Sequence, residues 1–366
     1  MFCERSRHRL LPDESKGLLL GCSTEGNKAA SAVSRNFPSL DRLGCRFDSY
    51  RAHHPNPAHI FVVESSHRAA CIAPLSMYTC RMRILAALFA LASIYAQSPQ
   101  TPSNPEWTKP FPPFRIIGNV YWVGTYDLSS YLITTPAGHI LINTGLRDTV
   151  PQIKAGIEQL GFKLSDVKIL TATHGHFDHV AGLAELKRLT GARLMMSEQD
   201  AELLASGGKS DFRFGDNPTA RFEPVHVDRK LKNGDTIELG GVVLTAHLHP
   251  GHTKGATSFT FDIREANKTY RVGIINMASI NPGVRVSGMP KFPDIEQAYA
   301  RTFHDQKEMK LDVWLASHAA QFDLHKKYHP GDPYNPDRFV DPQGFQAAVA
   351  RLEKIYRYQL ANEQGK

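Results

Sequence analysis

The chain has 366 residues, of which 42% are hydrophobic, 22% charged and 9% aromatic. This is the composition of a globular protein, and it excludes a disordered chain, a collagen-like chain and a coiled coil. The formal net charge is +7, but residues 1–96 carry +5 of it (12 Lys/Arg, 7 Asp/Glu) and residues 97–366 carry only +2 (31 Lys/Arg, 29 Asp/Glu). The basic excess therefore lies early in the chain, and we expect no nucleic-acid partner for the rest.

The early part of the chain contains the pattern of a targeting segment. Residues 82–96 follow Arg81, include Arg83, and consist of an apolar stretch that ends in small residues. This is the layout of a secretory signal peptide; a buried helix is the alternative. We expect residues 1–81 to be a disordered, non-native upstream extension, 82–96 to be the signal peptide, and 97–113 to be a flexible mature N-terminus. The mature protein is then periplasmic or secreted, with no membrane association.

From residue 114 onward, short apolar runs alternate with helical patterns. Strands are predicted at Arg115–Val123, Ser130–Thr134, His139–Asn143, Val167–Thr173, Arg193–Ser197, Thr236–Leu239, Val242–His249, Ser258–Asp262, Tyr270–Ile275 and Asp312–Ala316. Helices are predicted at Thr149–Leu160, Val180–Leu189, Glu198–Ala205, Ile295–Met309 and Gln343–Leu360. This order predicts an α/β fold, an αββα sandwich of two packed mixed sheets with helices on the outer faces, in one domain at 114–366.

The strongest chemical signal follows the strand predicted at Val167–Thr173. It is the run His174-Gly175-His176-Phe177-Asp178-His179, which places three imidazoles and one carboxylate within six residues. Imidazole nitrogens and carboxylate oxygens are zinc ligands, so a loop with this content predicts a metal site. The alternative is that Asp178 caps the next helix and the histidines are ordinary polar loop residues. Capping does not explain four ligand-type residues in six positions.

Further ligands are expected after other predicted strands. His252 in Pro250-Gly251-His252-Thr253 and His318 in Ala316-Ser317-His318 each lie where a turn would present them to the same sheet edge. His247 and His249 alternate along a strand and are as consistent with packing as with binding. All five cysteines precede residue 81, so the domain offers no thiolate ligand and no cysteine nucleophile.

These motifs resemble the metallo-β-lactamase superfamily, and in particular the third subclass (B3) of the class B β-lactamases. The resemblance spans about Trp107 to Leu360. It is carried by the His174–Gly182 motif, by Gly207-Gly208 with Phe214-Gly215-Asp216, by His249–Gly255 and by Ser317-His318. It implies two Zn²⁺ ions per chain. By position, the first ion would be held by His174, His176 and His252, and the second by Asp178, His179 and His318.

The same resemblance implies an activity. The protein would be a zinc-dependent β-lactamase that hydrolyses the amide bond of penicillins, cephalosporins and carbapenems with a zinc-bound hydroxide, which Asp178 would orient. The segment Gly273–Gly283 contains neither Asp nor Cys, which is the pattern of the third subclass. Departures are Asn143, where the family often has Asp, and the loss of serines near Met277–Ile280. Ser279, Asn281 and Lys254 remain as candidate contacts for a small-molecule β-lactam, and we expect a monomer.

Three other functions are compatible with the fold. A lactonase or thioester hydrolase, also a secreted binuclear metallo-hydrolase, would share the metal site without lactamase activity. A non-catalytic zinc-binding protein would bind the metal and hydrolyse nothing. A nucleic-acid processing enzyme would need an inserted domain and a basic cleft, and the sequence shows neither.

Overall fold

The computed structural model describes residues 104–365. The upstream extension expected at 1–81 and the signal peptide expected at 82–96 lie outside the described residues, and so does the segment 97–103. In the described part of the chain, no helix is both long enough and apolar enough to cross a membrane.

The segment just before the domain is in contact with it. A short 3-10 helix, η1 (Pro105–Trp107), begins after Asn104, whose side chain caps it. Downstream, the ring of Phe111 packs edge-on against Phe114 and Trp122. The sequence predicts a flexible tail over 97–113. In the described part of that segment Phe111 contacts the sheet, and the flexibility of the segment stays a prediction.

The first sheet has seven strands in the order β1-β2-β3-β4-β5-β6-β7. Pairs from β1 to β4 are antiparallel and pairs from β4 to β7 are parallel. The strands are β1 (Phe114–Ile117), β2 (Val120–Trp122), β3 (Tyr131–Thr135), β4 (Gly138–Ile142), β5 (Val167–Thr171), β6 (Arg193–Ser197) and β7 (Arg229–Leu231).

The second sheet has five strands in the order β12-β11-β10-β9-β8, antiparallel except for the parallel pair β11–β12. The strands are β8 (Thr236–Leu239), β9 (Val242–Leu248), β10 (Thr257–Glu265), β11 (Lys268–Ile275) and β12 (Val313–Ala316).

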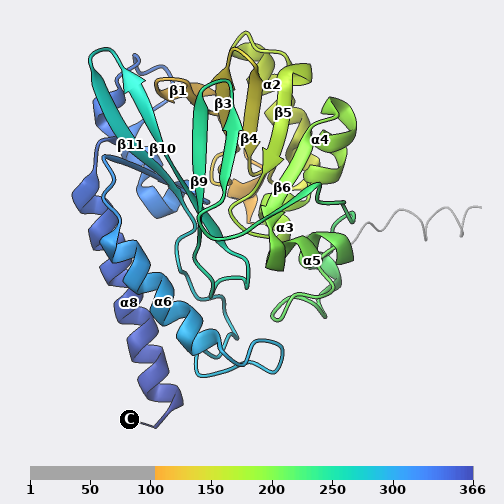
Figure 1. The fold of residues 1–366 in the computed structure, drawn as a ribbon, viewed down its shortest axis with the longest axis vertical. Coiled ribbons are helices and arrows are strands. Elements are labelled where there is room, and N and C mark those ends of the chain that lie inside the picture. Colours follow the sequence, from red (N-terminus) through yellow and green to blue (C-terminus); the bar gives the residue numbers. More distant parts are fainter. Residues whose placement is uncertain (1–103, 366) are drawn as a thin grey trace, which may run out of the picture. The chain divides into compact units, whose positions relative to one another are not determined.

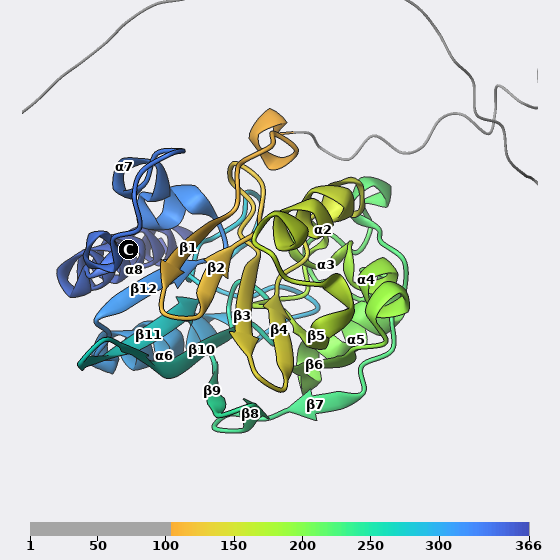
Figure 2. The ribbon, with the colours of Figure 1, turned by 90° about the horizontal axis from the view of Figure 1, so that it is seen from above.

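Helices flank both sheets (Figures 1 and 2). On the side of the first sheet lie α2 (Val150–Gln159), α3 (Phe177–Val180), α4 (Leu183–Thr190) and α5 (Glu198–Ser206). On the side of the second sheet lie α6 (Ile295–Glu308), α7 (Leu324–Lys327) and α8 (Pro342–Glu363).

Alternating side chains divide the interior into layers. In β4, Ile140 and Ile142 belong to the large core that also contains Phe259 and Phe261 of β10, so it lies between the sheets. Leu141 points the other way, into a second core shared with α2 and α4. Full burial of each such side chain stabilises the fold by about 1.5–3 kcal/mol. A strand with two apolar faces is therefore favourable only where both faces are covered, as they are inside a sandwich. The expected αββα fold is confirmed.

Three local features differ from the sequence-based expectation. The strand expected at Arg115–Val123 is a hairpin, because Gly118 takes a left-handed φ of +55° and turns the chain between β1 and β2. The helix expected at Val180–Leu189 is split into α3 and α4 by Ala181 and Gly182. Strand β7 was not expected, because its three residues give no periodicity.

The loops that carry the candidate ligands meet at one end of the sandwich. An antiparallel bridge joins Leu128 to His318, and the amide of Thr257 donates to the carbonyl of Thr173 at 2.7 Å, so the two sheets are connected there.

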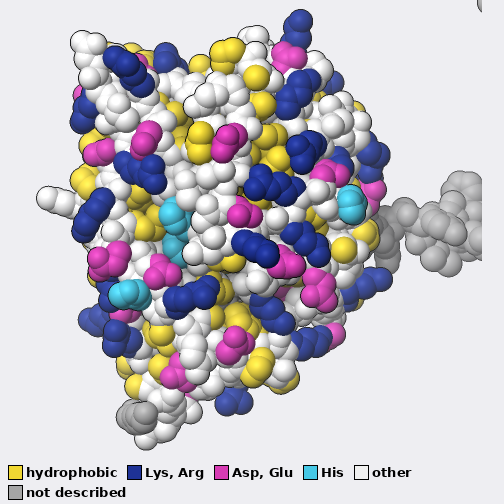
Figure 3. All heavy atoms as spheres, in the orientation of Figure 1, with side chains coloured by type: hydrophobic (Ala, Val, Ile, Leu, Met, Phe, Trp, Pro, Cys, Tyr) yellow, Lys and Arg dark blue, Asp and Glu magenta, His cyan; other side chains and the backbone are white. Residues whose placement is uncertain are grey.

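Figure 3 shows basic and acidic side chains interspersed on the face drawn, with no continuous basic stripe on it.

Candidate metal centre

The loop after β5 is fixed at its start by the residue that directly follows β4. Asn143 has a left-handed φ of +63°, which asparagine tolerates better than most residues. Its Oδ1 accepts hydrogen bonds from the amide of Thr173 at 2.9 Å and from the Thr173 hydroxyl at 3.2 Å. That hydroxyl lies 2.8 Å from the hydroxyl of Ser317. Asn143 therefore links the loops that carry His174 and His318. The family often has Asp at this position.

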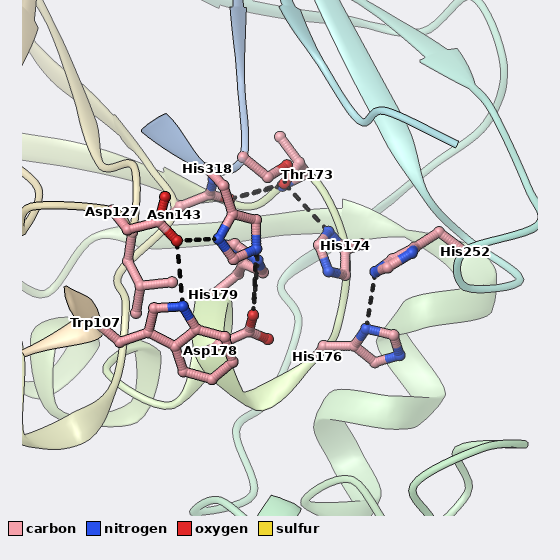
Figure 4. A network of polar contacts seen from close by, with 12 residues as sticks. Trp107, Asp127, Asn143, Thr173, His174, His176, Asp178, His179, His252 and His318 are labelled. Carbon is pink, nitrogen blue, oxygen red and sulfur yellow. Dashed lines mark hydrogen bonds and ion pairs between the residues drawn. The ribbon is translucent and has the colours of Figure 1, made fainter. Parts of the chain in front are cut away.

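The first group of candidate ligands consists of three imidazoles. His174 and His176 come from the loop after β5, and His252 comes from the loop between β9 and β10. Their nitrogens lie within 4.8 Å of one another, and Nδ1 of His176 is 3.2 Å from Nε2 of His252. Figure 4 shows the three rings converging from two loops. We call this set the first trio.

The second group combines a carboxylate with two imidazoles. Oδ2 of Asp178 lies 3.2 Å from Nε2 of His179 and 3.5 Å from Nε2 of His318, and these two nitrogens are 3.2 Å apart. His179 and Asp178 also group with His174, which lies between the two sets. We call Asp178, His179 and His318 the second trio; Figure 4 shows it beside the first.

These distances fit a zinc site. Four ligands at about 2.0–2.1 Å in a tetrahedron are separated by roughly 3.3–3.4 Å. This separation agrees within about 0.2 Å with the three distances between ligand atoms in the second trio and with the His176–His252 distance. In addition, Nε2 of His174 is buried and has no hydrogen-bond partner among the described residues. A buried ring nitrogen without a partner is costly unless a cation binds it, so the donor set fits a divalent metal.

Hydrogen bonds from outside the trios orient two of the rings. Nδ1 of His252 lies 2.8 Å from the carbonyl of Ser279, which also accepts the Tyr299 hydroxyl at 3.0 Å. Nδ1 of His318 lies 2.9 Å from Oδ2 of Asp127. When Nδ1 donates in these contacts, the lone pair of Nε2 points into the cluster. Such partners fix the tautomer of a metal-binding histidine.

Burial and charge set the protonation states of these groups in the protein without metal. Burial lowers the pKa of His252 to about 3 and lowers the pKa of His174 well below its ordinary value, with a further contribution from neighbouring histidines. Burial opposes ionisation of Asp178, but His179 and His318 hold the pKa of Asp178 well below its usual range. Burial likewise opposes protonation of His318, yet Asp127 and Asp178 raise its pKa to about 9. His174 and His252 are thus neutral imidazoles beside the ionised Asp178, as metal binding requires. Burial opposes protonation of His176, the third member of the first trio, but Asp211 raises its pKa.

Comparison with known proteins identifies the family. The family model of the metallo-β-lactamase superfamily matches residues 124–265. A β-lactamase from Chitinophaga pinensis is 46% identical, has a TM-score of 0.70, and the match covers 72% of this chain and 99% of that one. The chain belongs to the metallo-β-lactamase superfamily. A second solved structure, the class B3 di-zinc metallo-β-lactamase LRA-12 from an Alaskan soil metagenome, is 46% identical with a TM-score of 0.69, over 72% of this chain and 100% of that one.

The fold and these neighbours identify the chain as a hydrolase of the metallo-β-lactamase family, in which a binuclear zinc centre is typical. Among curated proteins, a hydroxyacylglutathione hydrolase from Rhodopseudomonas palustris is 28% identical over 136 residues, 37% of this chain. The chain spans 44% of the length of that relative.

The metallo-β-lactamase domain brings together all six residues that the resemblance assigned to zinc. Ser279 lies against them, since its carbonyl and its hydroxyl both approach Nδ1 of His252. Lys254 instead lines a separate 400 Å³ pocket with Phe292 and Arg301. Asn281 belongs to a turn in which its carbonyl accepts the amide of Val284. His247 and His249 lie outside both trios and hydrogen-bond to Thr260 and Ser258 of the neighbouring strand.

Three acidic residues around the trios were not predicted as site residues. Asp127 contacts His318, Asp211 lies 3.3 Å from Nε2 of His176, and Asp200 binds the loops that carry the first trio. A single carboxylate has no local sequence pattern, because its role depends on partners up to 191 residues away. For Asp211, the sequence offered one indication of a role near the site, because this residue lies within the Gly207–Asp216 stretch that carries part of the resemblance.

Proposed function

We propose that the protein is a zinc-dependent β-lactamase that hydrolyses the amide bond of penicillins, cephalosporins and carbapenems. The observation that carries the proposal is the pairing of a three-histidine trio with an Asp–His–His trio at one end of the sandwich. The similarity to class B3 β-lactamases over nearly their whole length supports the substrate class.

The distances within the two trios and the family resemblance support the following ligand sets. His174, His176 and His252 would hold one ion and Asp178, His179 and His318 the other. Bound zinc supplies a Lewis acid for the lactam carbonyl and lowers the pKa of water enough to provide a nucleophile near neutral pH.

Asp178 has a second role in this proposal. Its Oδ2 faces His179 and His318, whereas its Oδ1 has no hydrogen-bond partner among the described residues. Because the neighbouring imidazoles keep Asp178 ionised, Oδ1 is available to accept a hydrogen bond from an attacking water and to orient it. The described domain has no cysteine, and the proposal needs no covalent intermediate.

Aromatic side chains border the two trios. The ring of Phe214 lies 5.1 Å from that of His176, and the ring of Trp107 lies 6.0 Å from that of His318. These apolar surfaces limit the access of bulk water and give the apolar part of a substrate a surface to contact.

A candidate site for the substrate carboxylate adjoins Ser279. A cavity of 220 Å³ is lined by Ser279, Gln321 and Arg351, among others. Ser279 contacts His252, and Oε1 of Gln321 accepts the backbone amide of His318 at 3.3 Å, so the cavity wall touches both trios. Arg351 is the cation in this wall and is proposed to attract the carboxylate that β-lactams carry.

The test is hydrolysis by the purified protein with and without added zinc. A chromogenic cephalosporin and a carbapenem should be turned over, and a chelator should abolish turnover until zinc is restored. A thioester of glutathione and a simple lactone serve as competing substrates, because the curated relatives are hydroxyacylglutathione hydrolases. Hydrolysis of the thioester but of neither lactam would replace this proposal with a thioester hydrolase.

A further inference from the structure

A buried carboxylate outside both trios joins the two loops of the first trio. Asp200 lies in α5 and is fully buried. Its Oδ2 accepts the amide of Gly175 at 2.8 Å and the hydroxyl of Thr253 at 2.7 Å. Its Oδ1 accepts the amide of Gly255 at 2.8 Å. All three groups are donors, so the contacts suit an ionised carboxylate with no proton of its own.

The donors are placed next to the ligands in the chain. Gly175 lies between His174 and His176, and Thr253 follows His252 directly. One buried side chain therefore contacts a residue beside every member of the first trio, although His176 and His252 are 76 residues apart.

Both glycines let the backbone approach the carboxylate closely. A Cβ on Gly255 would lie 2.8 Å from Cγ of Asp200 and 2.5 Å from its backbone nitrogen, closer than real Cβ atoms come. A Cβ on Gly175 would lie 3.4 Å from Cγ of Asp200 and 3.2 Å from Leu203. The hydroxyl of Ser197, at the start of α5, adds a contact by donating to the Gly255 carbonyl at 2.6 Å. The first turn of α5 therefore contacts both of these loops closely.

His318 of the second trio is held by other residues. Asp127 orients its ring, and Asn143 and Thr173 join its loop to the loop of His174 through Ser317. The three groups that hydrogen-bond to the Asp200 carboxylate all flank the first trio.

From this arrangement we infer that Asp200 is a positioning residue that sets the spacing of His174 and His176 relative to His252, and thereby the metal affinity of the first trio but not of the second. The inference rests on the proposed function only in taking the trios as metal sites.

The sharpest variant is D200N, which keeps the size of the side chain. An asparagine must place its NH₂ group against the amide of either Gly175 or Gly255, where Asp200 now accepts at 2.8 Å. We expect zinc affinity at the first trio to fall about 10–100-fold, the usual effect of losing a residue that supports a metal ligand. The matched control is D228N, because Asp228 accepts the Leu194 amide at 2.7 Å but touches neither loop.

The measurement is titration of the full chain with Zn²⁺ and Co²⁺ in two single-site backgrounds. H318A leaves the first trio intact, and H252A leaves the second. D200N should weaken binding in the H318A background and change it by less than about twofold in the H252A background. Equal weakening in both backgrounds, or unchanged affinity in the first, would overturn the inference.

A second variant decides the case if D200N does not fold. T253V is close in shape and removes only the hydroxyl that donates to Oδ2. It should weaken the first trio in the same selective way, though less than D200N, and wild-type affinity would again overturn the inference. Lactam hydrolysis is measured separately: selective metal loss without any lactamase activity in the parent protein would reject the proposed substrate and leave the role of Asp200 intact.

Discussion

Nδ1 of His318 lies 2.9 Å from Oδ2 of Asp127, a residue 191 positions earlier in the chain. The same oxygen lies 3.2 Å from Nε1 of Trp107, and the other carboxylate oxygen accepts the amide of Ala320 at 3.2 Å. Asp127 thus holds both the ring of His318 and the loop that follows it. A member of the second trio is oriented by a carboxylate that is not a proposed ligand.

Replacement of Asp127 by asparagine should weaken the second trio. An amide in place of the carboxylate reduces the strength of the His318 contact and permits the wrong tautomer, so zinc affinity should fall about 10–100-fold at that trio. Zinc titration in the H252A background measures the effect. Asp323→Asn, which removes an exposed ion pair with Lys326, should leave affinity unchanged; a similar loss in that control would refute a specific role for Asp127.

Replacement of Asp178 by alanine should nearly abolish turnover. The variant loses a proposed ligand and the oxygen that would orient water, and we expect kcat to fall by at least about 10²–10⁴-fold, the range for loss of a positioned acid or base. Steady-state hydrolysis of a chromogenic cephalosporin provides the measurement. Asp216→Ala is the control, since that side chain is fully exposed. Near-normal rates in Asp178→Ala would remove this residue from the mechanism.

Chelation should reduce stability as well as activity. Metal that binds only the folded state stabilises it by about 2.7 kcal/mol per site at a free concentration of 100 Kd. Removal therefore lowers Tm by several degrees and leaves buried imidazoles without partners. Thermal unfolding with and without chelator measures the change, and added zinc should reverse it. An unchanged Tm together with retained activity would argue against both metal sites.

His249 should make the protein less stable in acid. Burial lowers the pKa of His249 to about 3, whereas an unfolded histidine titrates near 6.5. The unfolded state then binds the proton first, so the stability that neutral His249 provides is complete above about pH 6.5 and is lost as the pH falls towards 3.

Urea unfolding of the parent protein and of His249→Asn, at pH 7.5 and at pH 5, measures this effect. The loss of unfolding free energy on acidification should be smaller in the variant. His329→Asn, at an exposed histidine, should behave as the parent protein does. An equal loss of unfolding free energy on acidification in the parent protein and in His249→Asn would contradict this role of His249.

Particular residues show how much of the fold and of the candidate site could be predicted from the sequence pattern. The run from His174 to His179 was recognisable because its ligand-type residues are adjacent and follow an apolar strand. His252 and His318 could be expected at the same sheet edge because each also follows a strand. Gly118 was missed as a turn because the apolar residues around it continue with the spacing of one long strand.

The sequence by itself determined the layered fold and the candidate ligands, because both depend on local order: the alternation of apolar residues along strands and the clustering of histidines at strand ends. The division of those ligands into two groups came from the resemblance to class B3 β-lactamases. Only the tertiary structure decided which carboxylates orient and space those ligands. Asp127 and Asp200 act through hydrogen bonds to segments far away in the chain, and such contacts arise only when packing of the two sheets closes the long loops between them.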